Sequence, residues 1–184
     1  DVWIGKYWLQ NQITPGTIKF RTPPYTYNAK AERDAKVAAG DINGDGRDDV
    51  VVFGEFRTWI ATAADGRFNR NGGSADFGYR DGWRLDRHER MVADVNGDGR
   101  DDLIGFGDDG VYVALSNGRS FGRVTLWSDN FGYNDGWRVD LHERLVADVN
   151  GDGMADIVAF GDDVVRVALS NGSGFEAPGY PDEF

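Results

Sequence analysis

The chain has 184 residues, of which 40% are apolar and 13% aromatic, and a formal net charge of −11. This content is sufficient for a packed core and excludes a disordered chain, and no apolar run approaches the roughly 20 residues that a membrane-spanning helix requires. The acidic balance argues against a nucleic-acid partner, which needs clustered Lys and Arg to bind phosphates.

Residues 1–34 predict two strands followed by a connecting loop. An alternating aromatic run over residues 2–8 predicts the first strand, Pro15-Gly16 a turn, and residues 17–20 the second strand. Both resemble the third and fourth strands of the units described next. We therefore expect this segment to contribute the outer strands of an incomplete unit, and the chain to begin in the middle of that unit.

A nine-residue phrase then occurs three times: DINGDGRDD at 41–49, DVNGDGRDD at 94–102 and DVNGDGMAD at 148–156. Asp and Asn at its first, third, fifth and ninth positions supply oxygen ligands, and its glycines allow the backbone to curl around a hard cation. We expect about three Ca²⁺ sites. The loops are not EF-hands, and we expect them to bind weakly, with a Kd of about 10⁻⁴–10⁻³ M. With the seventh position included, the predicted metal set is Asp41, Asn43, Asp45, Arg47, Asp49, Asp94, Asn96, Asp98, Arg100, Asp102, Asp148, Asn150, Asp152, Met154 and Asp156.

Short apolar strands surround each loop, and no segment has a helical period. The fixed spacing of the loops indicates a tandem repeat, with repeat 1 at 35–76, repeat 2 at 77–130 and repeat 3 at 131–184. Four short antiparallel strands per repeat are typical of a β-propeller blade, so we predict an all-β chain of about three and a half blades. The expected strands are 36–40, 49–54 and 58–61, then 90–93, 103–107, 111–115 and 121–127, and finally 144–147, 157–161 and 164–169.

Repeats 2 and 3 share a longer phrase, FGYRDGWRLDRHERMVADVNGDGRDDLIGFGDDGVYVALSNG at 77–118 and FGYNDGWRVDLHERLVADVNGDGMADIVAFGDDVVRVALSNG at 131–172. The phrase resembles the FG-GAP or VCBS-type calcium-binding repeats. It is more closely similar to the repeats of the seven-bladed lectin family typified by Psathyrella velutina. Residues 35–76 match only in part. The GWRxxxHxR stretch is more specific than the calcium loop, which occurs in many unrelated extracellular proteins.

An aromatic face beside fixed hydrogen-bond donors suits a sugar, whose C–H face packs on an indole. The resemblance implies pockets between blades that bind terminal N-acetylglucosamine or sialic acid. Packing of the Trp between blades, a backbone hydrogen bond for the His and an ion pair for the Arg are the alternatives, and Tyr79 and Tyr133 are expected to be core or edge aromatics. Repeat 1 has Lys30, Ala35 and Val37 at the matching places and is expected to lack the site. The predicted sugar-binding residues are Trp83, His88, Arg90, Trp137, His142 and Arg144.

An enzyme is the rival class, and the sequence argues against it. A glycosidase needs two facing carboxylates, but the Asp residues here are assigned to the loops. The repeated His88-Glu89 and His142-Glu143 pairs have no Ser or Cys beside them in an elbow-type turn. We therefore predict a binder with no catalytic residues. The alternative is a non-catalytic adhesion or targeting region of a larger secreted hydrolase or toxin, with purely structural calcium.

The expected partners are glycans and a further chain or copy that completes the propeller. Propellers close with four to eight blades, and an open arc would leave strand edges and an apolar flank uncovered. Weak calcium loops favour a secreted, extracellular protein, and Asp1 in place of Met suggests a processed chain. The sequence contains no cysteine, so disulfides give no information on the compartment. Asn171-Gly172-Ser173 is a formal glycosylation acceptor.

Overall fold

The structure is a computed structural model that describes residues 2–4, 7–9, 35–55, 58–64, 67–71 and 76–179. At its start, β1 (Val2–Ile4) pairs with β2 (Tyr7–Leu9) in antiparallel fashion, with Trp3 opposite Trp8. The prediction of one strand across residues 2–8 was wrong, because this segment contributes two strands that pair with each other. Two residues separate these strands in the sequence, which is the length of a tight hairpin connection. The predicted strand at 17–20 lies outside the described residues.

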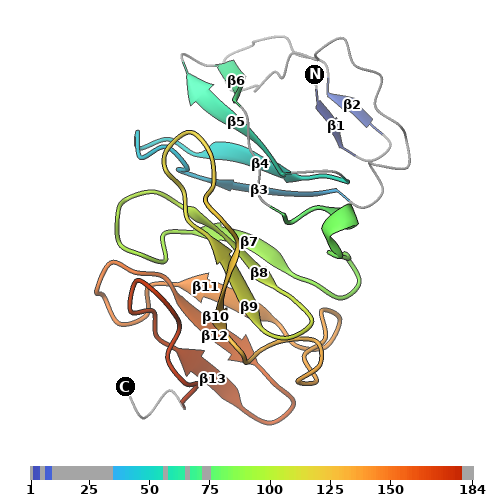
Figure 1. The fold of residues 1–184 in the computed structure, drawn as a ribbon, viewed down its shortest axis with the longest axis vertical. Coiled ribbons are helices and arrows are strands. Elements are labelled where there is room, and N and C mark those ends of the chain that lie inside the picture. Colours follow the sequence, from blue (N-terminus) through green and yellow to red (C-terminus); the bar gives the residue numbers. More distant parts are fainter. Residues whose placement is uncertain are drawn as a thin grey trace.

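Three larger antiparallel sheets follow, and each is one blade (Figure 1). Within a blade the strands pair in chain order, which confirms the predicted all-β blade architecture. In blade 3, Gly179 bridges to Val167 at the place of a fourth strand. The strands are β3 (Lys36–Gly40), β4 (Asp49–Phe53), β5 (Thr58–Ala64) and β6 (Arg67–Asn71) in blade 1, β7 (Arg90–Ala93), β8 (Asp102–Phe106), β9 (Val111–Ala114) and β10 (Thr125–Ser128) in blade 2, and β11 (Arg144–Ala147), β12 (Asp156–Phe160) and β13 (Val165–Ala168) in blade 3.

The innermost strands have the predicted bounds, and the other strands differ slightly. In blades 2 and 3 the second strand begins one residue earlier than predicted, at the buried Asp102 and Asp156, because the last residue of each loop already pairs with the innermost strand. β6 was not predicted, since its sequence RFNRN has no apolar run; it forms by backbone pairing along β5. One short 3₁₀ turn, Tyr79–Asp81, lies within the FGYRDG segment.

Apolar side chains fill both seams between neighbouring blades. Phe53 and Phe77 pack with Leu103 between blades 1 and 2, while Phe106 and Ile157 pack between blades 2 and 3. β3 lies beside β7, and β7 beside β11, so the innermost strands are neighbours (Figure 1). Burial of these faces is the main favourable contribution to holding the blades together.

The nine-residue loops also contact one another across the seams. Asp101 N donates to Asp41 O at 2.8 Å, and Ala155 N donates to Asp94 O at 2.7 Å. Each innermost strand ends in such a loop, whereas the GWRxxxHxR stretch precedes the strand. The loops and the GWRxxxHxR stretches therefore lie at opposite ends of the blades.

Candidate functional site

The segments that precede β7 and β11 are anchored to the previous blade. Tyr133 N donates to Gly107 O at 2.9 Å, and Asn134 N donates to Asp108 O at 2.8 Å. The turn then reverses at Gly136, whose φ of 95° is favourable only for glycine. As a result, both FGY…GWR segments bridge two blades, a place between blades that the family resemblance implied.

Within the segment, Trp and His are brought together in both complete repeats. The rings of Trp83 and His88 meet edge to face with centroids 5.3 Å apart, and those of Trp137 and His142 do so at 5.4 Å. His88 Nδ1 accepts a hydrogen bond from Arg84 N at 3.1 Å. The proton of the neutral ring is therefore on Nε2, which lies 3.1 Å from Asp108 Oδ1 and donates to it.

In repeat 2 this cluster is in the interior. Trp83, His88 and Arg90 are 7%, 4% and 1% exposed. The Trp83 indole packs on Phe77 with centroids 4.7 Å apart, and its Nε1 donates to Asp76 O at 2.9 Å. The burial of these side chains favours the packing alternative for Trp83, and the bond from Arg84 N favours the backbone hydrogen-bond alternative for His88.

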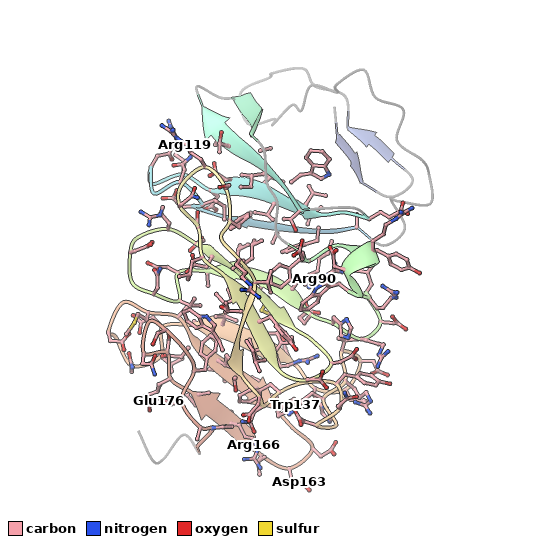
Figure 2. The ribbon with its side chains drawn as sticks, viewed as in Figure 1. Arg90, Arg119, Trp137, Asp163, Arg166 and Glu176 are labelled. Carbon is pink, nitrogen blue, oxygen red and sulfur yellow. The ribbon has the colours of Figure 1, made fainter. Side chains whose placement is uncertain are left out.

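Arg90 and Arg144, which end the two His-Glu-Arg sequences, are both buried and each donates to a backbone carbonyl. Arg90 Nη1 donates to Phe77 O at 3.0 Å, and Arg144 Nη1 donates to Phe131 O at 3.3 Å. Burial lowers the pKa of Arg144 to about 10. Figure 2 shows Arg90 within the stack of blades, in agreement with its burial. In repeat 3, by contrast, Trp137 and His142 are partly exposed.

A cleft of about 610 Å³ opens beside these buried residues, at the seam between repeats 2 and 3. The Tyr133 ring is part of its lining, with the guanidinium of Arg87 4.0 Å from the ring centroid and that of Arg138 3.8 Å from it. None of these three residues was among the predicted sugar-binding residues, although all three lie in the phrase shared by repeats 2 and 3, and Tyr133 was expected to be a core or edge aromatic. The lining residues are Asp86, Arg87, Tyr133, Arg138, Val139 and Asp140.

Hydrogen bonds and an ion pair hold both guanidinium groups in place. Arg138 Nη1 donates to Tyr133 O at 2.6 Å and to Trp137 O at 3.0 Å. Arg87 Nη2 lies 2.8 Å from Asp108 Oδ1, the oxygen that also accepts from His88. The buried His88 therefore shares with Arg87 the Asp108 carboxylate, and the main-chain carbonyl of Trp137 holds Arg138. With fixed cationic donors, two carboxylates and one valine, the cleft can bind a polar ligand that carries several hydroxyl or carbonyl groups.

The seam between blades 1 and 2 has only part of this arrangement. Arg84 lies over the Tyr79 ring at 3.8 Å, as Arg138 does over Tyr133. In the sequence, Asp34 takes the place of Arg87, and it lies outside the described residues. Lys30, which matches Trp83 in repeat 1, also lies outside them.

The nine-residue loops have the predicted coiled conformation. Asp94 Oδ1 accepts from Gly97 N at 2.7 Å, and its Oδ2 accepts from Gly99 N at 2.7 Å. The first-position Asp of the other two loops accepts the same pair of hydrogen bonds. Gly97 and Gly99 have φ of 73° and 79°, which explains the need for glycine at these positions.

The ninth-position carboxylates are fully buried in all three loops. Asp102 Oδ1 accepts from Ser116 N at 2.7 Å, and burial raises the pKa of Asp102 to about 7. In the first loop, Asp49 Oδ2 is buried and has no hydrogen-bond partner among the described residues. Buried carboxylate oxygens of this kind, together with Asp and Asn at the other positions, fit a hard cation in their chemistry.

The side chains at the fifth and seventh positions of the first two loops form ion pairs with each other. The seventh-position Arg47 and Arg100 pair with the fifth-position Asp45 and Asp98, and Met154 in the third loop has no charge with which to do so. Across the described part of the chain, no group of three or more His, Cys, Asp or Glu side chains is arranged to hold a metal ion.

Comparison with known proteins gives several similar solved structures, among them the following two. One is an Agrocybe aegerita lectin described for specific recognition of non-reducing terminal N-acetylglucosamine, with 38% identity and a TM-score of 0.75 over 80% of this chain and 38% of the lectin chain. The other is the Tc holotoxin pore of Photorhabdus luminescens, at 19% identity and a TM-score of 0.58 over 77% of this chain and 7% of the toxin chain, a likeness of fold alone. This chain thus spans well under half of the lectin. No protein-family model and no curated protein matches it, and no described helix is long and apolar enough to cross a membrane.

Proposed function

We propose that this chain is the carbohydrate-binding part of a β-propeller, without catalytic activity, and that it recognises terminal N-acetylglucosamine in the cleft around Tyr133. The observation that carries this proposal is the cleft itself, a hollow at a blade seam with fixed donors and acceptors. Similarity to a lectin that recognises this sugar supports the ligand class.

Each group that lines the cleft has a role in the proposal. Arg87 and Arg138 donate to ring hydroxyls or to the acetamido carbonyl, and Asp86 and Asp140 accept from hydroxyls. Val139 offers an apolar contact for the acetyl methyl group. Because two guanidinium groups also suit a carboxylate, sialic acid is the second ligand class that we propose for the same cleft.

The buried residues of the GWRxxxHxR stretch have a supporting role in this proposal. Trp83, His88 and Arg90 hold the segment between blades and do not contact the sugar. In repeat 3, Trp137 and His142 support Arg138, which bonds to the Trp137 carbonyl and whose backbone N–H donates to His142. The main chain of Trp137 and the imidazole of His142 thus help to position Arg138.

The experiment is a glycan array followed by titration of the preferred sugar into wild type, Arg87→Leu and Tyr133→Ala. Repeat 3 has Leu141 at the position of Arg87, so the fold tolerates leucine there. We expect both variants to lose binding while their melting temperatures stay close to wild type. Arg119→Leu, an exposed position at the opposite end of the blade, is the matched control (Figure 2). Undiminished binding by both cleft variants would refute this placement of the site.

A single site of this kind is expected to be weak. One monosaccharide in an open cleft gives a Kd of about 1 mM, which corresponds to about −4 kcal/mol. Repetition of the seam in a longer propeller would raise the effective affinity by multivalency. A comparison of monovalent and multivalent sugar ligands measures this contribution.

We also propose that the nine-residue loops bind Ca²⁺ as structural clamps, in a protein that is secreted. The buried Asp49, Asp102 and Asp156 would ligate the ion together with the outer Asp and Asn side chains. A bound ion stabilises the native state by mass action. Calorimetric titration with Ca²⁺ after EDTA treatment tests this, and absence of both binding heat and a rise in melting temperature would refute it.

The outer face of blade 3 supports the proposal of a partner sheet. Phe160 and Val149 are 41% and 51% exposed, whereas their counterparts in blade 2, Phe106 and Val95, are fully buried by blade 3. By this internal analogy, we propose that another blade, from a second copy or a further segment, covers the face. Exposed apolar patches of this kind are typical of interfaces.

A further inference from the structure

The turn after β13 contains a feature that the proposed sugar site does not use. Asn171, Gly172 and Ser173 form the only Asn-x-Ser/Thr triplet of the sequence. This triplet is the acceptor pattern for N-linked glycosylation. The corresponding turn of blade 2 has Asn117, Gly118 and Arg119, and therefore lacks the hydroxyl residue.

The Asn171 side chain is exposed and presents the nitrogen that glycosylation modifies. Its Oδ1 accepts from Ser173 N at 3.1 Å and from Ser173 Oγ at 2.9 Å. Its Nδ2 makes no hydrogen bond to any residue that the structure describes. In blade 2, Asn117 Nδ2 instead donates to Ser120 Oγ at 2.9 Å. A sugar on Asn171 would consequently break no internal hydrogen bond.

Other groups maintain the turn and leave room for a glycan. Asn171 N donates to Gly174 O at 3.0 Å, and Gly172 N donates to Ser170 Oγ at 3.2 Å. Ser170 Oγ in turn donates to Val95 O at 2.6 Å, so the turn lies at the end of the blades that carries the nine-residue loops. The Tyr133 cleft is at the opposite end, where a glycan on Asn171 would not cover it.

We propose that Asn171 is an N-glycosylation site, modified when the chain passes through a eukaryotic secretory pathway. The co-substrate is an oligosaccharide on a polyprenyl diphosphate. Asn171 Nδ2 forms a bond to the anomeric carbon and loses one proton, while the bond from that carbon to the diphosphate oxygen breaks and the diphosphate leaves with the electron pair. The acceptor pattern also requires a hydroxyl two residues after the Asn, and Ser173 supplies it in contact with the Asn171 carboxamide. This proposal is independent of the proposed sugar site.

The experiment is expression of the full chain behind a secretion leader in a eukaryotic host. Intact mass is measured on protein from the secretory compartment, before and after treatment with peptide N-glycosidase, so the result does not depend on efficient secretion. We expect a mass increase of one N-glycan, which the enzyme removes while converting Asn171 to aspartate. Asn171→Gln and Ser173→Ala should abolish the increase, and Ser173→Thr should retain it.

Asn117→Gln is the matched control, since it changes the same turn in blade 2 without touching the triplet. It should carry the wild-type glycan. An unmodified mass for wild-type protein from this compartment would overturn the proposal. An unchanged glycan on Asn171→Gln would overturn it equally. Circular dichroism of each purified variant checks that the compared proteins share one fold.

Discussion

The hydroxyl of Ser116 donates a hydrogen bond of 2.6 Å to the carbonyl oxygen of Ile42, across the seam between blades 1 and 2. Ser170 makes the same bond to Val95 across the next seam. These four residues occupy matching positions in successive repeats, so the repeat specifies the contact between blades as well as the blade itself. Both serines are buried, which makes each bond costly to remove.

Ser116→Ala should destabilise the chain, because it leaves the buried Ile42 carbonyl without this donor. An unsatisfied buried group costs about 1–3 kcal/mol. Urea unfolding followed by Trp fluorescence measures the change. Ser120→Ala removes a hydroxyl that bonds only at the exposed turn and should have little effect. Equal losses for the two variants would contradict the role of the seam bond.

Gly105→Ala should destabilise blade 2, because a Cβ at this position would overlap the rings of Trp83 and Phe77. Overpacking of this kind costs about 1–3 kcal/mol. Blade 3 has Ala159 at the matching position, where Trp137 is less buried. Ala159→Gly is therefore the matched control and should change the melting temperature much less. A neutral Gly105→Ala would show that the Trp83 packing adapts easily.

His88 should make stability depend on pH near neutrality. Burial lowers the pKa of His88, although Asp108 opposes that change. Because the folded pKa lies below the ordinary value of about 6.5, the unfolded chain binds more protons in this window. The contribution of neutral His88 to the free energy of unfolding is complete above pH about 6.5. It is lost as the pH falls through the folded pKa of His88. Melting temperatures at pH 5 to 8 should therefore fall toward acid more steeply for wild type than for His88→Gln; equal slopes would contradict this assignment.

Asp102 should act in the opposite direction when no ion is bound. Its pKa is raised to about 7, so the neutral carboxyl favours the folded state at low pH and this contribution is lost as the pH rises through about 7. As the pH rises toward about 7, chelator-treated wild type should lose stability relative to chelator-treated Asp102→Asn. If the loops bind Ca²⁺ as proposed, added Ca²⁺ should remove the loss in wild type only. Parallel curves for the two proteins would contradict the prediction.

Phe160→Lys should reduce any self-association, while it leaves the blades folded, since Phe160 lies on the uncovered face of blade 3. Light scattering over a range of concentrations measures the association, and thermal melting measures the fold. The counterpart change Phe106→Lys places a charge in a buried seam and should prevent folding. A wild-type chain that stays monomeric at all concentrations would argue for a further segment, and against a second copy, as the covering sheet.

Local patterns in the sequence predicted much of the fold. The bounds of the innermost strands, the coiled nine-residue loops and the association of Trp83 with His88 depend on residues close together in the chain, whose turn and hydrogen-bond preferences are local. The place of the FGY…GWR segments between blades, which the structure shows, was implied by the family resemblance. β6 and the hairpin of β1 and β2 were missed because backbone pairing formed them without an alternating apolar run of the expected length.

Which residues of those segments line the cleft depended on packing between blades. Trp83 packs on Phe77 within the core cluster that joins blades 1 and 2, and Arg90 lies over the Phe53 ring of blade 1. Arg87, a few residues away, reaches Tyr133 of the next repeat. A repeat motif names the residues of one blade but not the surfaces that its two neighbours cover. The sequence by itself thus determined the repeat, its strands and its loops, and only the tertiary structure decided which residues are buried supports and which line the cleft, because burial is a property of the assembled seam.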